Sequence, residues 1–363
     1  MNESSPDITK ECFAEWRSPR RGAKNPEVMT NALWAWLVDN RISAYAINEK
    51  FHGPSPFGEG PGWCFDRFGQ SETYLPDGRI VYVAGEHEDY YDPDFYIYND
   101  VVVKSPSGEI TIYCYPTEEF PPTDFHSATV VENALILIGN LGYPDDRRAG
   151  HTQVMRLDLA TWEVSRIHNT GDAPGWIGHH TASMSNSGRE IVVTGGRIDR
   201  LNGADDVENI DDWSLNVDTW CWTRLTRRPW SRFEVFREGM IRNHLWQIRH
   251  YQWAKKNAWH DLQEQENKLV KELGALPDLT LLSLLYAPDV ATQVLGEDEE
   301  RHSVYRIRIG EVVVRYVEDH FTIQVTVEGD MPDQVVKQLQ LDLVSKLSAL
   351  EQTQFICRTI ENQ

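Results

Sequence analysis

Three similar segments of the sequence each run from a polar turn through an aliphatic strand into glycine. They are PDGRIVYVAGE (76–86), ENALILIGNLG (132–142) and NSGREIVVTGG (186–196). They place Gly85, Gly139 and Gly195 at intervals of 54 and 56 residues. A period of this length is typical of repeat architectures, in which each repeat is one small structural unit. The repeat therefore limits the possible folds before any single residue is interpreted.

Each repeat has the pattern of four short strands. A hydroxyl-bearing strand precedes each glycine strand, with Ser71, Ser127 and Thr181 at matching positions, and two alternating strands follow it. This pattern predicts one antiparallel sheet per repeat. Because a single small sheet cannot bury both of its faces, we expect the sheets to stack, and a radial arrangement leaves only short edges. The glycines are expected at strand ends, where the backbone needs a positive φ or close packing.

The third repeat has two adjacent glycines, Gly195 and Gly196, followed by LNVDTW (215–220) and Trp222, and the second repeat has RLDLATW (156–162). These features resemble the kelch repeat, the blade of a β-propeller, over about residues 65–230. The first repeat departs from the pattern, since it lacks a Trp in its last strand. Closed propellers have at least about four blades. Three repeats therefore imply that another part of this chain supplies a sheet, that a second copy of the chain does so, or that the ring is incomplete.

We therefore expect a mainly β protein with α-helices: three kelch-like blades, an N-terminal helix and a C-terminal α+β domain. The expected parts are residues 1–62, with a helix over 25–50 that Asn25 caps; residues 63–230, the blades; and residues 231–363, helices followed by a β-meander and a long helix. On that last helix an apolar stripe predicts packing against the meander, which is also the internal candidate for a fourth sheet. The stripe consists of Val336, Leu339, Leu343, Leu347 and Leu350.

The composition limits the cellular setting and the partners. The chain has 35 Lys and Arg against 56 Asp and Glu, a net charge of −21, which argues against nucleic-acid binding and a polybasic membrane anchor. The sequence has no apolar signal core and no apolar run long enough to span a bilayer. Five scattered cysteines without CxxC spacing predict reduced thiols. We therefore expect a cytoplasmic protein that does not contact membranes.

Histidines of the repeat region are the first candidates for chemistry. His126 and His180 hold matching positions in the second and third repeats, where the first has Gln70. Zinc would need three or four converging ligands, whereas the simpler role of such residues is a hydrogen bond to the neighbouring blade. The sequence also shows no nucleophile elbow, Walker loop or dinucleotide fingerprint. We therefore expect no metal and no cofactor.

Two acidic loops occupy matching places in the first and third repeats, directly after the glycine strands. Both lack Lys and Arg from residue 86 to 100 and from 202 to 212, so the sequence predicts that their carboxylates form one negatively charged face. The candidate partner-binding residues are Glu86, Glu88, Asp89, Asp92, Asp94, Asp205, Asp206, Glu208, Asp211 and Asp212.

The favoured hypothesis is a non-catalytic protein-interaction module whose acidic face binds a basic protein, for example an immunity or antitoxin protein of a bacterium. The alternative is an enzyme, because the kelch resemblance also implies propellers that act as oxidoreductases or sugar isomerases near the central channel. The residues for that role are His126, His179, His180, Tyr90 and Tyr91.

A basic stretch interrupts the acidic sequence. Residues 223–256 carry nine Lys or Arg and two Glu, with Trp246 and Trp253 one heptad apart. We expect helices over 240–258 and 260–273 here, and we interpret the stretch as a helix that docks on the acidic blades rather than as a nucleic-acid patch.

Overall fold

The computed structural model describes residues 8–53, 61–88, 95–201, 206–299 and 301–361. It is mainly β with several helices, and it forms two compact units. The first unit is Met1–Leu201 with Glu208–Arg227, and the second is Asn202–Val207 with Arg228–Gln363. In the described part of the chain, none of the helices has both the length and the apolar character that crossing a bilayer requires.

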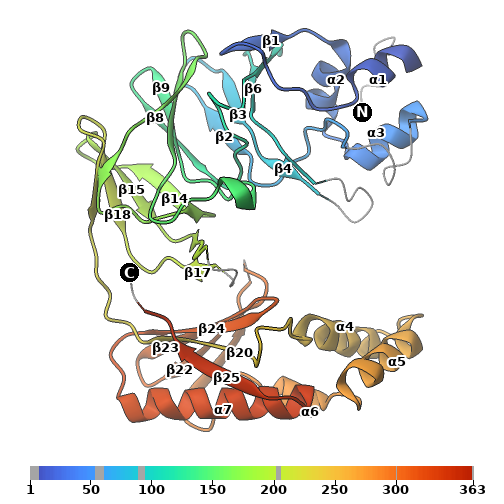
Figure 1. The fold of residues 1–363 in the computed structure, drawn as a ribbon, viewed down its shortest axis with the longest axis vertical. Helices are drawn as coiled ribbons and strands as arrows, with labels where there is room; N and C mark the ends of the chain where they lie inside the picture. The colour runs from blue at the N-terminus through green and yellow to red at the C-terminus, as the bar shows by residue number, and fades with distance from the viewer. Residues whose placement is uncertain (1–7, 54–60, 89–94, 202–205, 300, 362–363) are drawn as a thin grey trace. The chain divides into compact units, whose positions relative to one another are not determined.

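Each repeat forms one four-stranded antiparallel sheet, as the sequence predicts, and we call these sheets blades one, two and three (Figure 1). The strands of blade one are β2 (Ser71–Tyr74), β3 (Ile80–Val83), β6 (Asp100–Lys104) and β7 (Ile110–Cys114). Those of blade two are β8 (Ser127–Val131), β9 (Ala134–Ile138), β10 (Val154–Asp158) and β11 (Val164–Arg166). Those of blade three are β14 (Thr181–Met184), β15 (Glu190–Thr194), β18 (Trp213–Asn216) and β19 (Cys221–Arg224).

Short strands extend these sheets or join their loops. Strand β1 (Glu27–Met29) pairs with β7, and β12 (Thr170–Gly171) pairs with β19. The remaining pairs are β4 (Glu86–His87) with β5 (Tyr96–Ile97), and β16 (Arg197–Ile198) between β13 (Ile177–Gly178) and β17 (Val207–Glu208).

The strand pairing shows that the sequence alignment of the three glycines is shifted by one residue in blade one. Ser71 pairs with Val83 and Ser127 with Ile138, so Ala84, the residue after Val83, is the structural equivalent of Gly139. Ala84 has a φ of 52° and Gly139 a φ of 78°, so both adopt the left-handed conformation at the strand end. Gly85 is instead equivalent to Gly196, and a Cβ there would lie 2.9 Å from the carbonyl oxygen of Phe68. The expected equivalence of Gly85 with Gly139 is therefore wrong by one position.

The two ends of the row of blades differ in chemistry. Blade one has an apolar outer face, and three helices of the N-terminal segment cover it: α1 (Lys10–Trp16), α2 (Ala32–Asn40) and α3 (Ala44–Phe51). Trp34 of α2 is fully buried, and its ring stacks on that of Trp63 at 4.7 Å. Blade three ends the row with a polar face, on which Thr181 and Ser183 are exposed. In the first unit the described residues contain three such blades and do not close into a ring.

Blade two has buried side chains on both faces. All five residues of β9 are buried, and Leu135 and Leu137 pack against blade one, in a cluster with Val81 and Val103. A sheet in the middle of a row has a neighbour on each side, which accounts for this pattern. The neighbouring inner strands are β2 and β8, and β8 and β14.

The expected helix over 25–50 is wrong in its first part. Asn25 does not cap a helix; its side chain instead pairs with the backbone of Val164 in blade two, with Nδ2 at 2.7 Å from the carbonyl oxygen and Oδ1 at 2.9 Å from the amide. The true N-caps are Asn31 for α2 and Ser43 for α3, whose side-chain oxygens accept the usual backbone hydrogen bonds. Arg41, with a φ of 46°, ends α2.

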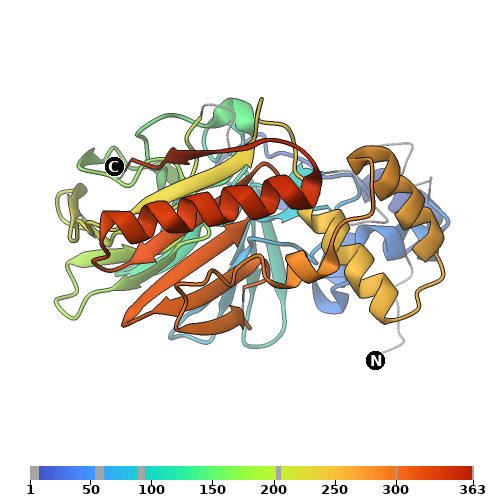
Figure 2. The same cartoon turned by 90° about the horizontal axis from the view of Figure 1, so that it is seen from below.

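The second unit is one six-stranded sheet with helices, and α7 (Asp333–Glu351) covers one face of the sheet (Figures 1 and 2). The strand order is β21 (Gln293–Glu297), β22 (Val304–Ile309), β23 (Val312–Glu318), β24 (Thr322–Glu328), β20 (Arg232–Arg237) and β25 (Phe355–Thr359). The other helices are α4 (Leu245–Lys256), α5 (Leu262–Leu273) and α6 (Leu279–Ser283). The predicted meander is β22–β23–β24, whereas β20, β21 and β25 were not expected.

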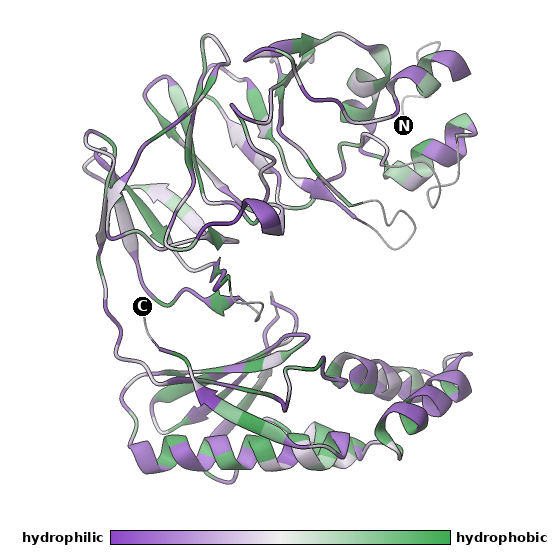
Figure 3. Ribbon diagram, viewed as in Figure 1, coloured by the Kyte–Doolittle hydropathy of each residue, from purple (hydrophilic) through white to green (hydrophobic). Residues whose placement is uncertain are grey.

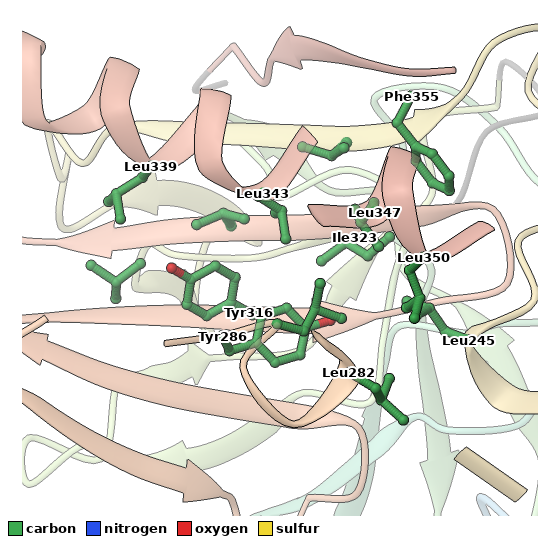
Figure 4. Packing of buried hydrophobic residues seen from close by; sticks show 14 of the residues in the cluster. Leu245, Leu282, Tyr286, Tyr316, Ile323, Leu339, Leu343, Leu347, Leu350 and Phe355 are labelled. Atoms are coloured by element: carbon green, nitrogen blue, oxygen red, sulfur yellow. The ribbon is translucent and has the colours of Figure 1, made fainter. Parts of the chain in front are cut away.

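The predicted apolar stripe of α7 is confirmed. Its five residues are all buried, and Leu339, Leu343 and Leu347 lie over the sheet with Ile323 and Tyr316 beneath them (Figure 4). Hydrophilic and hydrophobic patches alternate along the helix as a result (Figure 3).

We predict that Trp34→Ala destabilises the first unit by about 3–5 kcal/mol, because it removes a fully buried ring and leaves a cavity. The change also removes the hydrogen bond from Trp34 Nε1 to the carbonyl oxygen of Trp16, 2.7 Å long. Urea unfolding followed by circular dichroism measures the loss. Trp246→Ala is the matched control, since that ring is 64% exposed and its removal should change stability by less than about 0.5 kcal/mol. Equal losses in the two variants would contradict the capping role of α2.

Candidate functional site

The loops after the glycine strands lie at the same end of the three blades, as the repeat predicts. They connect β3 to β6, β9 to β10 and β15 to β18. Two hydrogen bonds join neighbouring loops: the amide of Ile97 donates to the hydroxyl oxygen of Tyr143 at 2.9 Å, and Arg147 Nη1 lies 2.5 Å from Asp199 Oδ2. We call the surface formed by residues 84–88, 95–99, 139–153, 195–201 and 208–212 the loop face. It is continuous across the three blades.

Beneath the loop face, the inner strands of the blades are joined by a repeated set of hydrogen bonds. The amide of Phe125 donates to the carbonyl oxygen of Gly69, and the amide of His179 donates to that of Phe125, both at 2.9 Å. One residue further along, His126 Nε2 lies 2.9 Å from the hydroxyl oxygen of Ser71, and His180 Nε2 lies 2.9 Å from that of Ser127. The expected role of these histidines, a hydrogen bond to the neighbouring blade, is confirmed.

Both histidines are held neutral. Burial lowers the pKa of His126 to about 3 and the pKa of His180 to about 4, and a neighbouring histidine adds to each effect. Their Nδ1 atoms are enclosed and make no hydrogen bond with the protein. His179 lies beside them with its ring stacked on Phe125 at 3.9 Å. Tyr90 and Tyr91, the remaining candidates for an enzyme site, lie outside the described residues.

The predicted acidic residues do not form one exposed face. Asp89, Asp92, Asp94 and Asp205 lie outside the described residues. Among the others, Glu88 is exposed and Asp206 and Asp212 are half-buried, whereas Glu86, Glu208 and Asp211 are buried. Asp206 also belongs to the second unit, where its carbonyl oxygen accepts a hydrogen bond from Gln324. The expectation that these carboxylates are all solvated is therefore corrected for Glu86, Glu208 and Asp211.

Asp211 has a structural role. Its carboxylate pairs with Arg224, whose Nε lies 3.1 Å from Oδ2, and it accepts a 3.0 Å hydrogen bond from the hydroxyl of Thr226. Register makes Asp100 its equivalent in blade one, and Asp100 is likewise buried and paired, with Arg67. In both blades the carboxylate therefore anchors the return of the chain from the loop face.

Glu86 lies near a second buried carboxylate, that of Asp124, which the sequence did not indicate. Burial raises the pKa of Glu86 to about 7, and the negative charges of Asp124 and Glu88 add to this shift. Burial also raises the pKa of Asp124, although its Oδ1 accepts a 2.7 Å hydrogen bond from the amide of Gly142. One oxygen of each carboxylate, Glu86 Oε2 and Asp124 Oδ2, is enclosed without a hydrogen-bond partner in the protein. Asp124 has no acidic counterpart in the other repeats, where Phe68 and Gly178 stand, so the pattern could not reveal it.

A cavity of about 90 Å³ lies next to the loop face. Its lining includes Ser43, Cys64, Arg67 and His87. Cavities that bind small molecules are usually about 300–1,000 Å³, so this one suits ordered water better than a substrate. Within the described ranges, no three His, Cys, Asp or Glu side chains come together as a metal-binding group.

Comparison with known proteins yields a match only among solved structures. No protein-family model and no curated protein matches the sequence. Among 91 matching chains of solved structures is a fungal alcohol oxidase of the AA5 family, solved in complex with copper. It is 12% identical to this chain, and the match covers 46% of this chain and 45% of the oxidase, with a TM-score of 0.30. The match therefore spans less than half of the oxidase.

We predict that Ser127→Ala lowers the free energy of unfolding by about 1–3 kcal/mol, because it leaves His180 Nε2 buried without its partner. Ser183→Ala on the exposed face of β14 is the matched control and should change stability by less than about 0.5 kcal/mol. Thermal and urea unfolding of the two variants provide the comparison. If Ser127→Ala were as stable as Ser183→Ala, the bond would have no role in holding the blades together.

Because the pKa values of His126 and His180 are lowered in the folded protein, we predict that the free energy of unfolding depends on pH. An unfolded histidine titrates near pH 6.5, so below this pH the unfolded chain takes up protons that folded His126 and His180 exclude. Their contribution to stability is therefore complete above about pH 6.5 and is lost as the pH falls towards their folded-state pKa values of about 3 and about 4. Each histidine should contribute a slope of up to about 1.4 kcal/mol per pH unit in this window.

The double variant H126Q/H180Q tests this expectation, since Gln70 holds the equivalent position in blade one. Its unfolding free energy, measured by urea titration between about pH 6.5 and pH 4.5, should fall less steeply than that of the unchanged protein. Glu86, whose pKa of about 7 acts in the opposite sense, is present in both proteins and cancels in the difference. Parallel slopes would contradict the assignment of neutral, buried histidines.

Proposed function

We propose that this chain is a non-catalytic interaction protein that binds a basic protein partner through the loop face. The observation that supports it best is the pair of bonds, Ile97 to Tyr143 and Arg147 to Asp199, that makes three separate loops one continuous surface. A surface shared by the loops of three blades offers many contacts, and the cavity beside it is only about 90 Å³, which suits a protein partner better than a small substrate.

The charge of the exposed residues gives the expected partner chemistry. Glu88 from blade one and Asp145 and Asp146 from blade two are exposed on the loop face, against one exposed cation, Arg148, in a chain with a net charge of −21. Carboxylates grouped on one surface attract a basic protein and speed its association, most strongly at low ionic strength. An immunity or antitoxin protein that blocks a basic toxin is one function of this kind.

The blades are part of the same proposal. Four-stranded antiparallel sheets, left-handed backbone after the second strand and the LNVDTW segment all support kelch-like blades. The helices on blade one and the polar face of blade three favour a row that ends at three blades. A second copy that completes a ring would have to bury Thr181 and Ser183, and the buried hydroxyl of Ser183 would then need a hydrogen-bond partner.

The enzyme alternative has less support. Two of its residues, His126 and His180, are occupied with the hydroxyls of the neighbouring blade and have pKa values far below neutrality. A general base acting near pH 7 needs a pKa closer to that value.

The test neutralises three exposed carboxylates of the loop face in the variant E88Q/D145N/D146N. The matched control E109Q/E132Q/E163Q removes three exposed charges from the hairpin turns at the opposite end of blades one and two. Both variants and the unchanged chain are immobilised and exposed in parallel to a lysate of the source cells, and captured proteins are compared by quantitative mass spectrometry. The partner should be a basic protein that the unchanged chain and the control retain and that the loop-face variant loses.

Kinetics with that purified partner then give the mechanism. We expect the loop-face variant to associate about three- to tenfold more slowly at low salt, with a smaller effect at high salt and little change in the off-rate. The control should keep the rate of the unchanged chain to within about twofold. Equal capture and equal on-rates for the loop-face variant and the control would place the binding surface elsewhere.

A further inference from the structure

Five aromatic rings form a row on the second unit, along α4 and the segment that connects it to α5; Figure 1 labels both helices. The row consists of Trp246, His250, Trp253, Trp259 and His260, and we call it the aromatic row. Successive ring centroids are 5.3, 5.8, 5.3 and 4.7 Å apart. The three tryptophans are 64%, 47% and 43% exposed. Large exposed aromatic side chains that touch one another mark an interaction surface rather than scattered surface residues.

The rings on α4 are left in solvent because the opposite face of this helix packs against the core of the second unit. Leu245, Ile248, Tyr251 and Ala254 are buried, and the first three belong to the core of the second unit. The helix is therefore fixed by one face, while Trp246, His250 and Trp253 recur on the other at spacings of four and three residues.

The charge around the row is opposite to that of the whole chain. Residues 239–260 contain two Arg, two Lys and no Asp or Glu, within a protein of net charge −21. Arg249 is neutralised by Glu318, with its Nε 2.8 Å from Oε2. Lys255 is turned to the other side of α4, where its Nζ lies 3.4 Å from the hydroxyl oxygen of Tyr251. The cations beside the row are thus Arg242 before α4 and Lys256 at its end, both exposed. A partner of this surface is expected to be anionic.

We propose that the aromatic row binds single-stranded nucleic acid, with bases stacked on the exposed rings and phosphates near Arg242 and Lys256. Single strands offer both chemistries that the surface presents, flat aromatic rings and a regularly spaced negative charge. The negative charge of the rest of the chain opposes the approach of a polyanion. At physiological ionic strength, however, charges more than about 8 Å apart are largely screened, so the local cations govern the contact.

The exposed side chains of residues 246–257 favour a nucleic acid over a lipid bilayer as the partner. Ile248, the only aliphatic residue larger than alanine within residues 246–257, is buried, so the exposed side chains of this stretch are aromatic, basic or amide groups. A helix that inserts into a bilayer exposes an apolar wedge and keeps its amides and charges on the other side. Here the polar and aromatic groups share one surface, which suits a polar ligand with flat rings.

The test uses the full chain and a fluorescently labelled oligothymidylate of about 20 nucleotides. Fluorescence anisotropy measures binding at about 0.05 M and 0.2 M salt. We expect salt-sensitive binding with quenching of tryptophan fluorescence, weakened about tenfold or more in W246A/W253A. The matched control L341A/V294A removes two exposed apolar side chains from the same unit and should bind like the unchanged chain. Circular dichroism confirms that each variant is folded.

A second pair of variants separates stacking from charge. R242Q/K256Q should bind with a shallower dependence on salt, whereas K268Q/K271Q, which removes two exposed lysines from α5, should leave the salt slope nearly unchanged. The loop-face variant E88Q/D145N/D146N should bind the oligonucleotide at least as well as the unchanged chain. The proposal is overturned if the oligonucleotide does not bind, or if W246A/W253A binds as well as L341A/V294A. Tryptophan-dependent binding to anionic phospholipid vesicles or tryptophan-dependent dimerisation, without oligonucleotide binding, would overturn it in favour of those partners.

Discussion

A four-stranded sheet has two faces, and in the first unit every apolar face must be covered. The middle blade has a neighbour on each side, and all five residues of β9 are buried as a consequence. The end blades solve the problem in different ways. Blade one keeps an apolar outer face and covers it with the aromatic side chains of the N-terminal helices, whereas blade three replaces apolar residues on its last face with threonine and serine. Repeat proteins generally need such end caps.

This constraint explains the role of several residues that would otherwise suggest catalysis. Where the inner strands of two blades meet, polar side chains between them are largely removed from water, so these groups must find partners in the adjacent blade. The bonds from His126 to Ser71 and from His180 to Ser127 do this. At the end of the row no further blade follows, and the hydroxyl of Thr181 bonds that of Thr194 in its own sheet instead, 3.0 Å away.

Much of the fold could be predicted because it depends on local patterns. The period of the glycine strands gave three four-stranded sheets, and the spacing of leucines along α7 gave its buried face. The errors arise where distant residues decide the outcome. Asn25 looks like a helix cap until Val164, far away in the sequence, supplies its partners. Glu86 and Asp211 look like solvated loop carboxylates, since neither the approach of Asp124 nor that of Arg224 can be read from the residues next to them.

The strand order of the second unit has a consequence for how this unit is made. Strand β20 is the first strand of the six-stranded sheet in sequence but lies between β24 and β25, which are formed by residues 322–328 and 355–359. During synthesis β20 leaves the ribosome before either neighbour, so one of its edges stays unpaired until residues 322–328 emerge and the other until residues 355–359 emerge. Its Glu234 is fully buried in the finished sheet and pairs with Arg358, 2.7 Å from the Nε of that residue. The unit therefore folds as a whole and late, and nascent chains must be protected from edge-to-edge association in the meantime.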